Sequence, residues 1–337
     1  MTAPNVVPRS ERAVCVTGMH RSGTSFTARA LQLLGASLGA SESLMAPGPD
    51  NPAGYWENRD VKELNDEVLA RLGGAWDLPP VLEPGWEHDE SLDPLRTRAW
   101  AVLEDAFGAA RSSSDVIAWK DPRLSLLLPF WRTVTPIAAT IVVVRDPREV
   151  AASLRTRNGI DLPQAMVLWL RYLYAGTGND PDHLLVRDRD FFVDLPGTLS
   201  RMAVHVGLPP PTLVVTDEAR AHLDPSLRHH AAEDDERVTE NPIVAMASMV
   251  WDNGAINLEC FPSAVTDAIR FGWVRAPIDA ELLARARAEV ITMRDRIRQR
   301  RRQERAAQGA VHRNATEEPS PSVTVGSGPR PIEDGDE

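Results

Sequence analysis

Residues 13–35 read AVCVTGMHRSGTSFTARALQLLG, and this stretch decides the fold. The apolar run 13–17 is typical of a buried strand, and the glycine-rich segment 18–25 follows it directly. The next segment carries apolar residues at helical spacing and ends at a glycine: Phe26, Ala30, Leu33, Leu34 and Gly35. The stretch therefore predicts a strand, a loop and a helix in succession.

The loop in this stretch has the spacing of a phosphate-binding loop. Gly18, Gly23 and Ser25 form the pattern GxxxxGxS. Backbone N–H groups of such a loop converge on an anion, and the N-terminus of the next helix attracts the same charge. Thr24 stands where ATP-binding loops carry a lysine, and Arg21 supplies a cation earlier instead. The loop therefore suits a nucleotide whose transferable group is not a magnesium-bound γ-phosphate.

The rest of the chain predicts further strands that alternate with helices. Short, almost wholly apolar runs, typical of strands buried on both faces of a parallel sheet, lie at 116–119, 140–144 and 183–187. Helices are predicted at 58–72, at 95–110, from Pro147 onward and at 196–206. This alternation favours an α/β fold of the P-loop type, with a doubly wound parallel sheet flanked by helices.

Composition divides the chain into four parts. Residues 1–11 are predicted to be a flexible leader, and 12–275 the α/β domain. Part 276–311 is predicted to be a C-terminal helix. Within it, 279–306 has a 3-4-3-4 apolar spacing, so it either pairs with a second copy in a homodimer or packs as an ordinary helix. The composition of 312–337 is typical of a disordered acidic tail.

Charge and cysteine content limit the class of protein. A formal net charge of −11 disfavours a nucleic-acid binder, because the phosphate backbone rewards a basic surface. Cys15 and Cys260 give neither a disulfide framework nor metal-ligand spacing. No apolar stretch suits a signal sequence or a membrane span, so we expect a cytoplasmic protein. Only two of the 37 basic residues are lysines, a bias typical of high-GC bacterial coding.

A second candidate for anion binding follows the strand predicted at 140–144. Arg145 leaves the end of this strand, at the edge of the sheet where doubly wound folds bind ligands. Ser153 follows eight residues later, about two turns into the next helix. An arginine and a hydroxyl so placed can hold a phosphate from two sides. Alternatively, Arg145 pairs with Asp146 or another carboxylate and Ser153 only fills the helix.

Together, the two elements resemble those of the PAPS-dependent sulfotransferases, in particular the bacterial and carbohydrate-type members (PAPS is 3′-phosphoadenosine-5′-phosphosulfate). In that family an R/K-[ST]-G-[ST]-[ST] loop holds the 5′-phosphosulfate, and residues 21–25 match it as RSGTS. A V-R-D-P-R-x-V-x-x-S element holds the 3′-phosphate, and residues 144–153 match it as VRDPREVAAS. With NPAGYWEN at 51–58 and WKDPRL at 119–124, the resemblance covers roughly residues 13–230.

The resemblance implies transfer of the sulfuryl group of PAPS to an acceptor hydroxyl, in a reaction that requires no metal. Arg21 is then expected to stabilise charge on the leaving phosphate. The glycine-rich C-terminal loop of the cytosolic small-molecule enzymes is not recognisable, so no residue is assigned to the adenine. The residues expected to bind the donor are Arg21, Ser22, Gly23, Thr24, Ser25, Arg145, Ser153 and Arg123.

A base and further cations complete the expected site. Glu57 follows a proline- and glycine-rich loop, where members of the resembling families often carry the base, and otherwise it is an ordinary charge at a helix N-terminus. His20 is the alternative base, because histidine titrates near neutrality. Lys120 and Arg123 follow a buried strand and are candidates for a second cation near the sulfuryl group. Ion pairing with Asp121 or a helix end would explain both equally well.

Two other classes of protein stay open. A P-loop kinase or NTPase would bind ATP with Mg²⁺, which the missing lysine disfavours. A catalytically silent nucleotide-binding scaffold would keep both phosphate elements but not depend on Glu57. The acceptor is equally open among saccharides, lipid-linked glycans and natural-product hydroxyls. Four tryptophans would either stack on such an acceptor or fill the core: Trp56, Trp76, Trp86 and Trp100.

Overall fold

The computed structural model describes residues 12–48, 51–111, 116–223 and 242–252. Within these ranges, four parallel strands form one sheet in the order β2-β1-β3-β4. The strands are β1 (Arg12–Gly18), β2 (Val116–Lys120), β3 (Ala139–Val144) and β4 (Leu184–Arg187). The predicted parallel sheet is confirmed, and each strand differs from its predicted range by at most one residue at either end.

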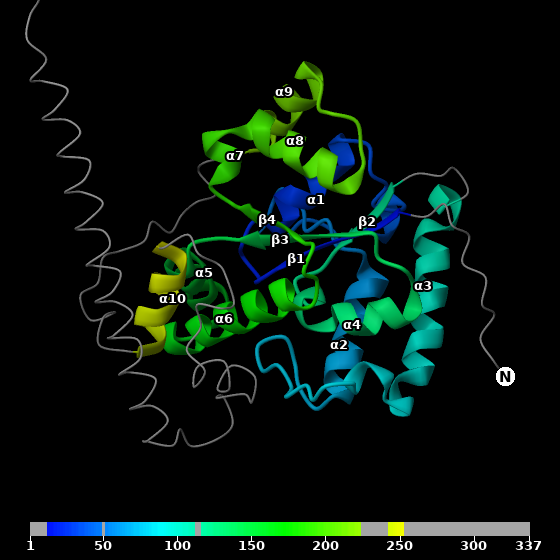
Figure 1. The fold of residues 1–337 in the computed structure, drawn as a ribbon, viewed down its shortest axis with the longest axis vertical. Helices are drawn as coiled ribbons and strands as arrows, with labels where there is room; N and C mark the ends of the chain where they lie inside the picture. The colour runs from blue at the N-terminus through cyan, green and yellow to red at the C-terminus, as the bar shows by residue number, and fades with distance from the viewer. Residues whose placement is uncertain (1–11, 49–50, 112–115, 224–241, 253–337) are drawn as a thin grey trace, which may run out of the picture. The chain divides into compact units, whose positions relative to one another are not determined.

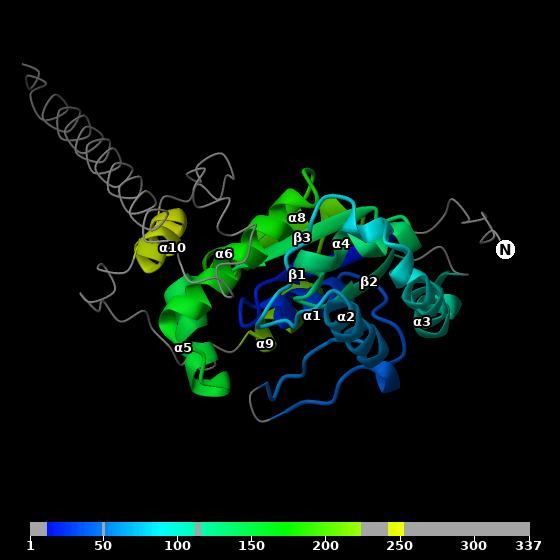
Figure 2. The same ribbon diagram turned by 90° about the horizontal axis from the view of Figure 1, so that it is seen from below.

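Helices cover both faces of this sheet (Figure 1). One face carries α1 (Thr24–Leu33), α7 (Asp190–Val193), α8 (Leu195–Val206) and α9 (Leu213–Ala221). The other carries α2 (Arg59–Arg71), α3 (Asp93–Arg111), α4 (Leu124–Val134), α5 (Pro147–Asn158), α6 (Leu162–Gly178) and α10 (Pro242–Asp252). Figure 2 shows α10 beside α5 and α6, which it contacts. Three short 3₁₀ helices lie at Ser41–Ser43, Trp86–His88 and Glu90–Leu92.

The two faces have separate apolar cores. Successive residues of a strand point to opposite faces, so Val14 lies in one core and Cys15 in the other. Both residues are fully buried, and burial raises the pKa of the Cys15 thiol far above its ordinary value. Because helices cover both faces of the sheet, almost every residue of β1, β2 and β3 is buried, and these strands are continuous apolar runs in the sequence. The doubly wound architecture expected from the sequence is confirmed.

The strand order brings the two phosphate elements together. The chain passes from β1 to β2 on one side and then returns to β3 on the other side of β1. In doubly wound folds, ligands bind at the carboxyl ends of the strands where this reversal occurs. The glycine-rich loop follows β1 and Arg145 follows β3, so both lie at this position.

Helix α4 is not predicted by the sequence, and Pro129 explains why. A proline inside a helix leaves the carbonyl four residues earlier without its usual donor. Here that carbonyl belongs to Ser125, and it accepts a hydrogen bond from Nδ2 of Asn179 at 2.9 Å. A contact from the end of α6 thus replaces the missing helical bond. Helices α6 and α10 are likewise absent from the expectations above.

Several expectations concern parts of the chain outside the described residues. They are the leader 1–11, the C-terminal helix 276–311 with its candidate dimer segment 279–306, and the tail 312–337, which stay predictions. Within the described ranges, none of the helices combines the length and the apolar character that crossing a membrane would require.

Candidate active site

A cavity of about 570 Å³ lies at the carboxyl ends of the strands. Residues at or just after the ends of all four strands line it: His20 and Arg21 after β1, Lys120 as the last residue of β2, Arg145 after β3 and Asp188 after β4. The loop 51–57 and the helix α5 contribute further walls. The cavity thus occupies the position where this sheet topology places a ligand.

Glycine is required at both ends of the phosphate loop. Gly18 and Gly23 have φ values of 136° and 90°, which side chains rarely adopt. A Cβ atom on Gly18 would lie 2.1 Å from the carbonyl oxygen of Val143, and one on Gly23 would lie 2.6 Å from Oδ1 of Asp188. The loop therefore packs directly against β3 and the end of β4.

The N-terminus of α1 opens onto the cavity. Its N-cap residue is Gly23, which provides no side chain to bond the first N–H groups of the helix. Gly23, Thr24 and Ser25 line the cavity, so these N–H groups lie where an anion would be bound. Ser22 is fully buried and does not line the cavity, so we retain only its backbone as a candidate for donor binding.

Arg21 connects the two phosphate elements. Its φ is 70°, and its Nε donates a hydrogen bond to Oγ of Ser153 at 2.8 Å. Arg145 donates from Nη1 to the backbone oxygen of Arg21 at 3.4 Å. The indole N–H of Trp169 donates a hydrogen bond to the backbone oxygen of Arg145 at 3.0 Å. The structure therefore brings together the arginines and the serine that the sequence assigns to the donor.

Arg145 pairs with a carboxylate, but its partner is not Asp146, the residue that the sequence suggested by name. Its Nε lies 2.7 Å from Oε2 of Glu149 and 3.8 Å from Oδ2 of Asp188. Asp146 instead caps the N-terminus of α5 and pairs with Arg148. A phosphate that binds Arg145 must therefore compete with Glu149 and Asp188 for the guanidinium.

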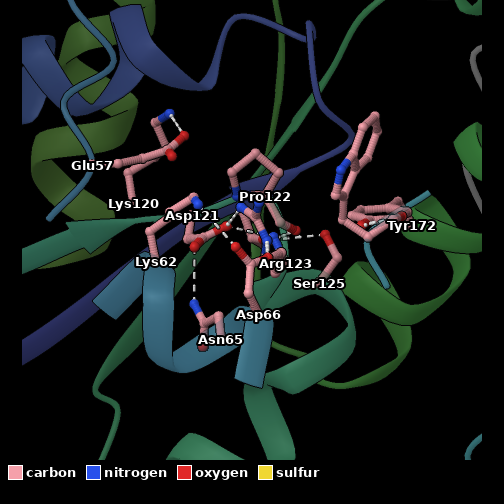
Figure 3. A network of polar contacts seen from close by, with 12 residues as sticks. Glu57, Lys62, Asn65, Asp66, Lys120, Asp121, Pro122, Arg123, Ser125 and Tyr172 are labelled. Atoms are coloured by element: carbon pink, nitrogen blue, oxygen red, sulfur yellow. Dashed lines mark hydrogen bonds and ion pairs between the residues drawn. The ribbon is translucent and has the colours of Figure 1, made fainter. Parts of the chain in front are cut away.

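Glu57 and Lys120 form a buried ion pair beside the phosphate loop (Figure 3). Nζ of Lys120 lies 2.5 Å from Oε1 of Glu57, and the side chains are 2% and 10% exposed. Both line the cavity. The alternative pairing of Lys120 with Asp121 is not found, and neither is a solvent-facing Glu57. A carboxylate and an ammonium thus stand together in the cavity that the phosphate loop borders.

The loop that carries Glu57 is tied to α1. Nδ2 of Asn51 donates to Oγ of Ser25 at 3.2 Å and to the backbone oxygen of Gly54 at 2.7 Å. Trp56 has a φ of 56°, and its ring lies 5.0 Å from the guanidinium carbon of Arg29. The backbone just before Glu57 therefore has an uncommon conformation, and the loop around it contacts α1 through Ser25 and Arg29.

Arg123 does not lie where a donor-binding residue is required, which corrects that expectation. Its guanidinium pairs with Asp66 and with Asp121, which is fully buried, and it does not line the cavity (Figure 3). These carboxylates offset the effect of burial, which lowers the pKa of Arg123, and leave it raised. Asp121 also accepts a bond from Nδ2 of Asn65, whose Oδ1 binds the indole N–H of Trp131. Arg123 therefore fixes α2 to the segment after β2.

His20 lies in the cavity wall but is a poor candidate for the base. Its ring packs 4.4 Å from that of Trp76 and 5.8 Å from that of Tyr172, measured between centroids. Burial, followed by the charges of Arg123, Lys120, Arg157 and Arg21, lowers its pKa well below the ordinary value of 6.5. A neutral imidazole in this setting binds a proton weakly.

Sequence reasoning missed several residues that line the cavity: Phe26, Arg29, Asn51, Arg157, Asp188 and His222. Asp188 directly follows a predicted strand, so its position was a detectable signal. His222 reaches the cavity through the fold of α9, which no local pattern indicates. Of the four tryptophans considered, Trp56 lines the cavity and Trp76 packs on His20, whereas Trp86 packs partly buried against the core. Trp100 lies at the surface.

No protein-family model matches this chain, and no curated protein is found as a relative. The chain is similar to the sulfotransferase domain of the olefin synthase of Synechococcus PCC 7002, with 16% identity and a TM-score of 0.40, over 74% of this chain and 97% of that one. It is also similar to the sulfotransferase STF1 of Mycobacterium tuberculosis H37Rv, with 17% identity and a TM-score of 0.41, over 68% and 76%. The function proposed below rests on the chain's own residues.

Proposed function

We propose that this protein transfers the sulfuryl group of PAPS to a hydroxyl group of an acceptor. The observation that carries the proposal is the content of one cavity. It combines a phosphate loop bearing Arg21, the pair Arg145 and Ser153, and the buried pair Glu57 and Lys120. PAPS carries anions at both its 3′ and 5′ positions, and the acceptor must lose a proton. The phosphate loop would bind the 5′ anion, Arg145 and Ser153 would bind the 3′ anion, and Glu57 would accept the proton of the acceptor.

The donor would be bound at both of its phosphates. The N-terminus of α1 and the loop around Gly23 would hold the 5′-phosphosulfate, with Arg21 placed to neutralise the leaving phosphate. Arg145 and Ser153 would hold the 3′-phosphate, because a guanidinium and a hydroxyl give charge-assisted bonds from two directions. Arg21 already bonds Ser153, so the two phosphate positions are coupled through a single hydrogen bond.

Glu57 would act as general base in an in-line displacement. Its carboxylate takes the proton of the acceptor hydroxyl while the acceptor oxygen bonds to sulfur. The bond between sulfur and the bridging oxygen breaks, and the electron pair stays on the 5′-phosphate of the product, 3′,5′-adenosine bisphosphate. Lys120 would leave Glu57 for the oxygens of the phosphosulfate, since these anions offer it a second partner in the same cavity.

The competing functions are less well supported by these residues. A kinase would place a lysine from its phosphate loop on the β- and γ-phosphates, and Thr24 stands there instead. A silent scaffold has no need for a carboxylate and an ammonium buried together beside the phosphate loop, an arrangement that costs desolvation energy. We propose a carbohydrate or natural-product acceptor, because Tyr55 and Trp56 supply an aromatic wall next to Glu57.

A binding titration tests this function first. The protein is titrated with 3′,5′-adenosine bisphosphate without metal and, separately, with ATP and Mg²⁺. Tight binding of the bisphosphate and weak binding of ATP are expected. An acceptor screen with radiolabelled PAPS then follows, with Glu57→Gln as the inactive control. A preference for ATP with Mg²⁺ would support a kinase, and binding of the donor with no transfer to any acceptor would support a scaffold.

A further inference from the structure

The side chain of Asn51 bridges its own loop and the first turn of α1. One atom of its amide lies 2.7 Å from the backbone oxygen of Gly54 and 3.2 Å from Oγ of Ser25. A backbone oxygen only accepts hydrogen bonds, so this atom is the amide nitrogen, Nδ2, and not the amide oxygen. The nitrogen carries two hydrogens and accepts none, and it therefore donates one hydrogen to Gly54 and one to Ser25.

This bond fixes the role of the Ser25 hydroxyl. Because Oγ of Ser25 accepts the hydrogen of Asn51, the hydrogen of the hydroxyl itself points to a different partner. Among the described residues, the Ser25 side chain makes no second hydrogen bond. Ser25 is half-buried, and both it and Asn51 line the cavity. The hydroxyl hydrogen is therefore available to an anion bound at the N-terminus of α1.

A second pair of an asparagine and a serine in the same connection shows the complete arrangement. Nδ2 of Asn58 donates to Oγ of Ser43 at 3.1 Å, and this hydroxyl donates in turn to the backbone oxygen of Ala40 at 2.6 Å. Ser43 does not line the cavity, and its hydrogen is used within the protein. At Ser25 the first bond is present, but the described residues provide no second acceptor. A ligand in the cavity would provide it.

Backbone hydrogen bonds hold Asn51 in place for this task. Its N–H donates to the backbone oxygen of Gly48 at 2.9 Å, and its own backbone oxygen accepts from the N–H of Gly54 at 3.0 Å. With the bond from the amide to Gly54, the turn 51–54 is closed in both directions. Because the amide is fixed before a ligand binds, the direction of the Ser25 hydroxyl is set in advance, which lowers the cost of ordering the site.

We infer that Asn51 is a positioning residue that turns the hydroxyl of Ser25 toward the 5′-phosphosulfate of the donor as a hydrogen-bond donor. This inference rests on the proposed function. The oxygens of the phosphosulfate are acceptors, so a hydroxyl helps to bind them only when its hydrogen, and not a lone pair, faces them. Asn51 belongs to the same connection as Glu57, so the segment that brings the base also prepares the donor site.

Calorimetry with two nucleotides and no metal tests this role. Of the two, 3′,5′-adenosine bisphosphate carries a 5′ anion and adenosine 3′-phosphate lacks it. Ser25→Ala and Asn51→Ala should each bind the bisphosphate about fivefold to tenfold more weakly and leave the affinity for adenosine 3′-phosphate unchanged. The double variant should lose no more than Ser25→Ala alone, because Asn51 acts through that hydroxyl. Ser43→Ala breaks the comparable bond away from the cavity and should change neither affinity.

A further variant at the same position reverses the direction of the bond. The carboxylate of Asn51→Asp accepts the hydroxyl hydrogen and turns a lone pair of Ser25 toward the ligand. This variant should therefore bind the bisphosphate more weakly than Asn51→Ala does. Because it keeps the size of the side chain, it decides the question even where Asn51→Ala fails to fold. Thermal melting of every variant controls for folding.

Other results would overturn the inference. Equal losses for the two nucleotides in Asn51→Ala would mean that Asn51 only supports the fold of its loop. Additive losses in the double variant would mean that Asn51 acts on the donor without Ser25. Undiminished binding of the bisphosphate by Asn51→Ala and Asn51→Asp would mean that the hydroxyl needs no positioning. Failure of the wild-type protein to bind the bisphosphate would remove the proposed function itself, before any variant is compared.

Discussion

Nζ of Lys120 lies 2.5 Å from Oε1 of Glu57, and both side chains are almost completely withdrawn from solvent. Each charge is therefore the partner that makes burial of the other tolerable. Under the proposed function, binding of the donor comes before Glu57 can act as the base. Glu57 stays covered until a donor draws Lys120 away, so the base becomes available only when there is a group to transfer.

Replacing the base should separate turnover from binding. Glu57→Gln should lower kcat by roughly 10²–10⁴-fold, because the amide cannot accept the hydroxyl proton in the transition state. The affinity for 3′,5′-adenosine bisphosphate should change little. Turnover and binding are measured side by side with Glu63→Gln, an exposed position on α2, as the control. Near-normal turnover of Glu57→Gln would assign the proton transfer to another group.

Removing the cation of the pair should destabilise the fold. Lys120→Met leaves the carboxylate of Glu57 buried without its partner, and the free energy of unfolding should fall by about 3–5 kcal/mol. The double variant Lys120→Met with Glu57→Gln should recover much of this loss, because no uncompensated charge remains. Urea denaturation of the four proteins in this cycle measures the coupling. Additive effects in the double variant would show that the two side chains are energetically independent.

The 3′-phosphate assignment depends on Arg145 and Ser153. Arg145→Ala should weaken binding of 3′,5′-adenosine bisphosphate by roughly 10- to 100-fold, as expected for the loss of charge-assisted hydrogen bonds. Ser153→Ala should weaken it less, by about fivefold to tenfold. Arg155→Ala, an exposed residue of the same helix, is the matched control. Unchanged affinity in both variants would refute the assignment.

His20 should make stability depend on pH. Its pKa is lowered in the folded state, so the unfolded chain binds more protons in acid. The resulting stabilisation is complete above the unfolded pKa of about 6.5 and is lost as the pH falls toward the folded value, by up to about 1.4 kcal/mol per pH unit. Unfolding free energies at pH 8 and pH 5 should therefore differ more for the wild type than for His20→Gln. Parallel pH profiles would contradict the prediction.

The proline in α4 gives a test that is independent of function. Asn179→Ala removes the donor to the carbonyl of Ser125, which Pro129 prevents from forming its helical bond. We expect a loss of about 1–3 kcal/mol in the free energy of unfolding, as for a buried acceptor left unpaired. Asn158→Ala, at an exposed position at the end of α5, serves as control. Equal stability of the two variants would show that the bond is dispensable.

Sequence reasoning predicted those parts of the fold that local patterns determine. The strand 13–17 and the loop that follows it could be placed, because the apolar run and the glycines at Gly18 and Gly23 are unambiguous. Helix α4 could not, because Pro129 lies inside it and the carbonyl that this proline leaves without a helical donor bonds the distant Asn179. A single sequence does not reveal a helix whose hydrogen bonding is completed from another element.

The same limit applies to the site. Arg21, Arg145 and Ser153 were identified because each lies at a fixed distance from a strand end. Lys120 and Arg123 stand three residues apart with the same chemistry, yet only Lys120 reaches the cavity. Their side-chain directions depend on Glu57 and Asp66, which lie more than fifty residues earlier. The positions of their ion-pair partners therefore decide which of the two cations faces the cavity.

The placement of Glu57 on a connecting loop has an evolutionary consequence. The expected donor contacts come from the ends of β1 and β3 and the helices that follow, whereas Glu57 comes from the connection between α1 and α2. Asn51 is the side chain through which that connection bonds Ser25. Apart from Glu57, which pairs with Lys120 at the end of β2, side chains of the connection can change without removing the bonds that Arg21 makes with Ser153 and Arg145. Under the proposed function, a lineage built on this arrangement can exchange one acceptor for another while inheriting its donor unchanged.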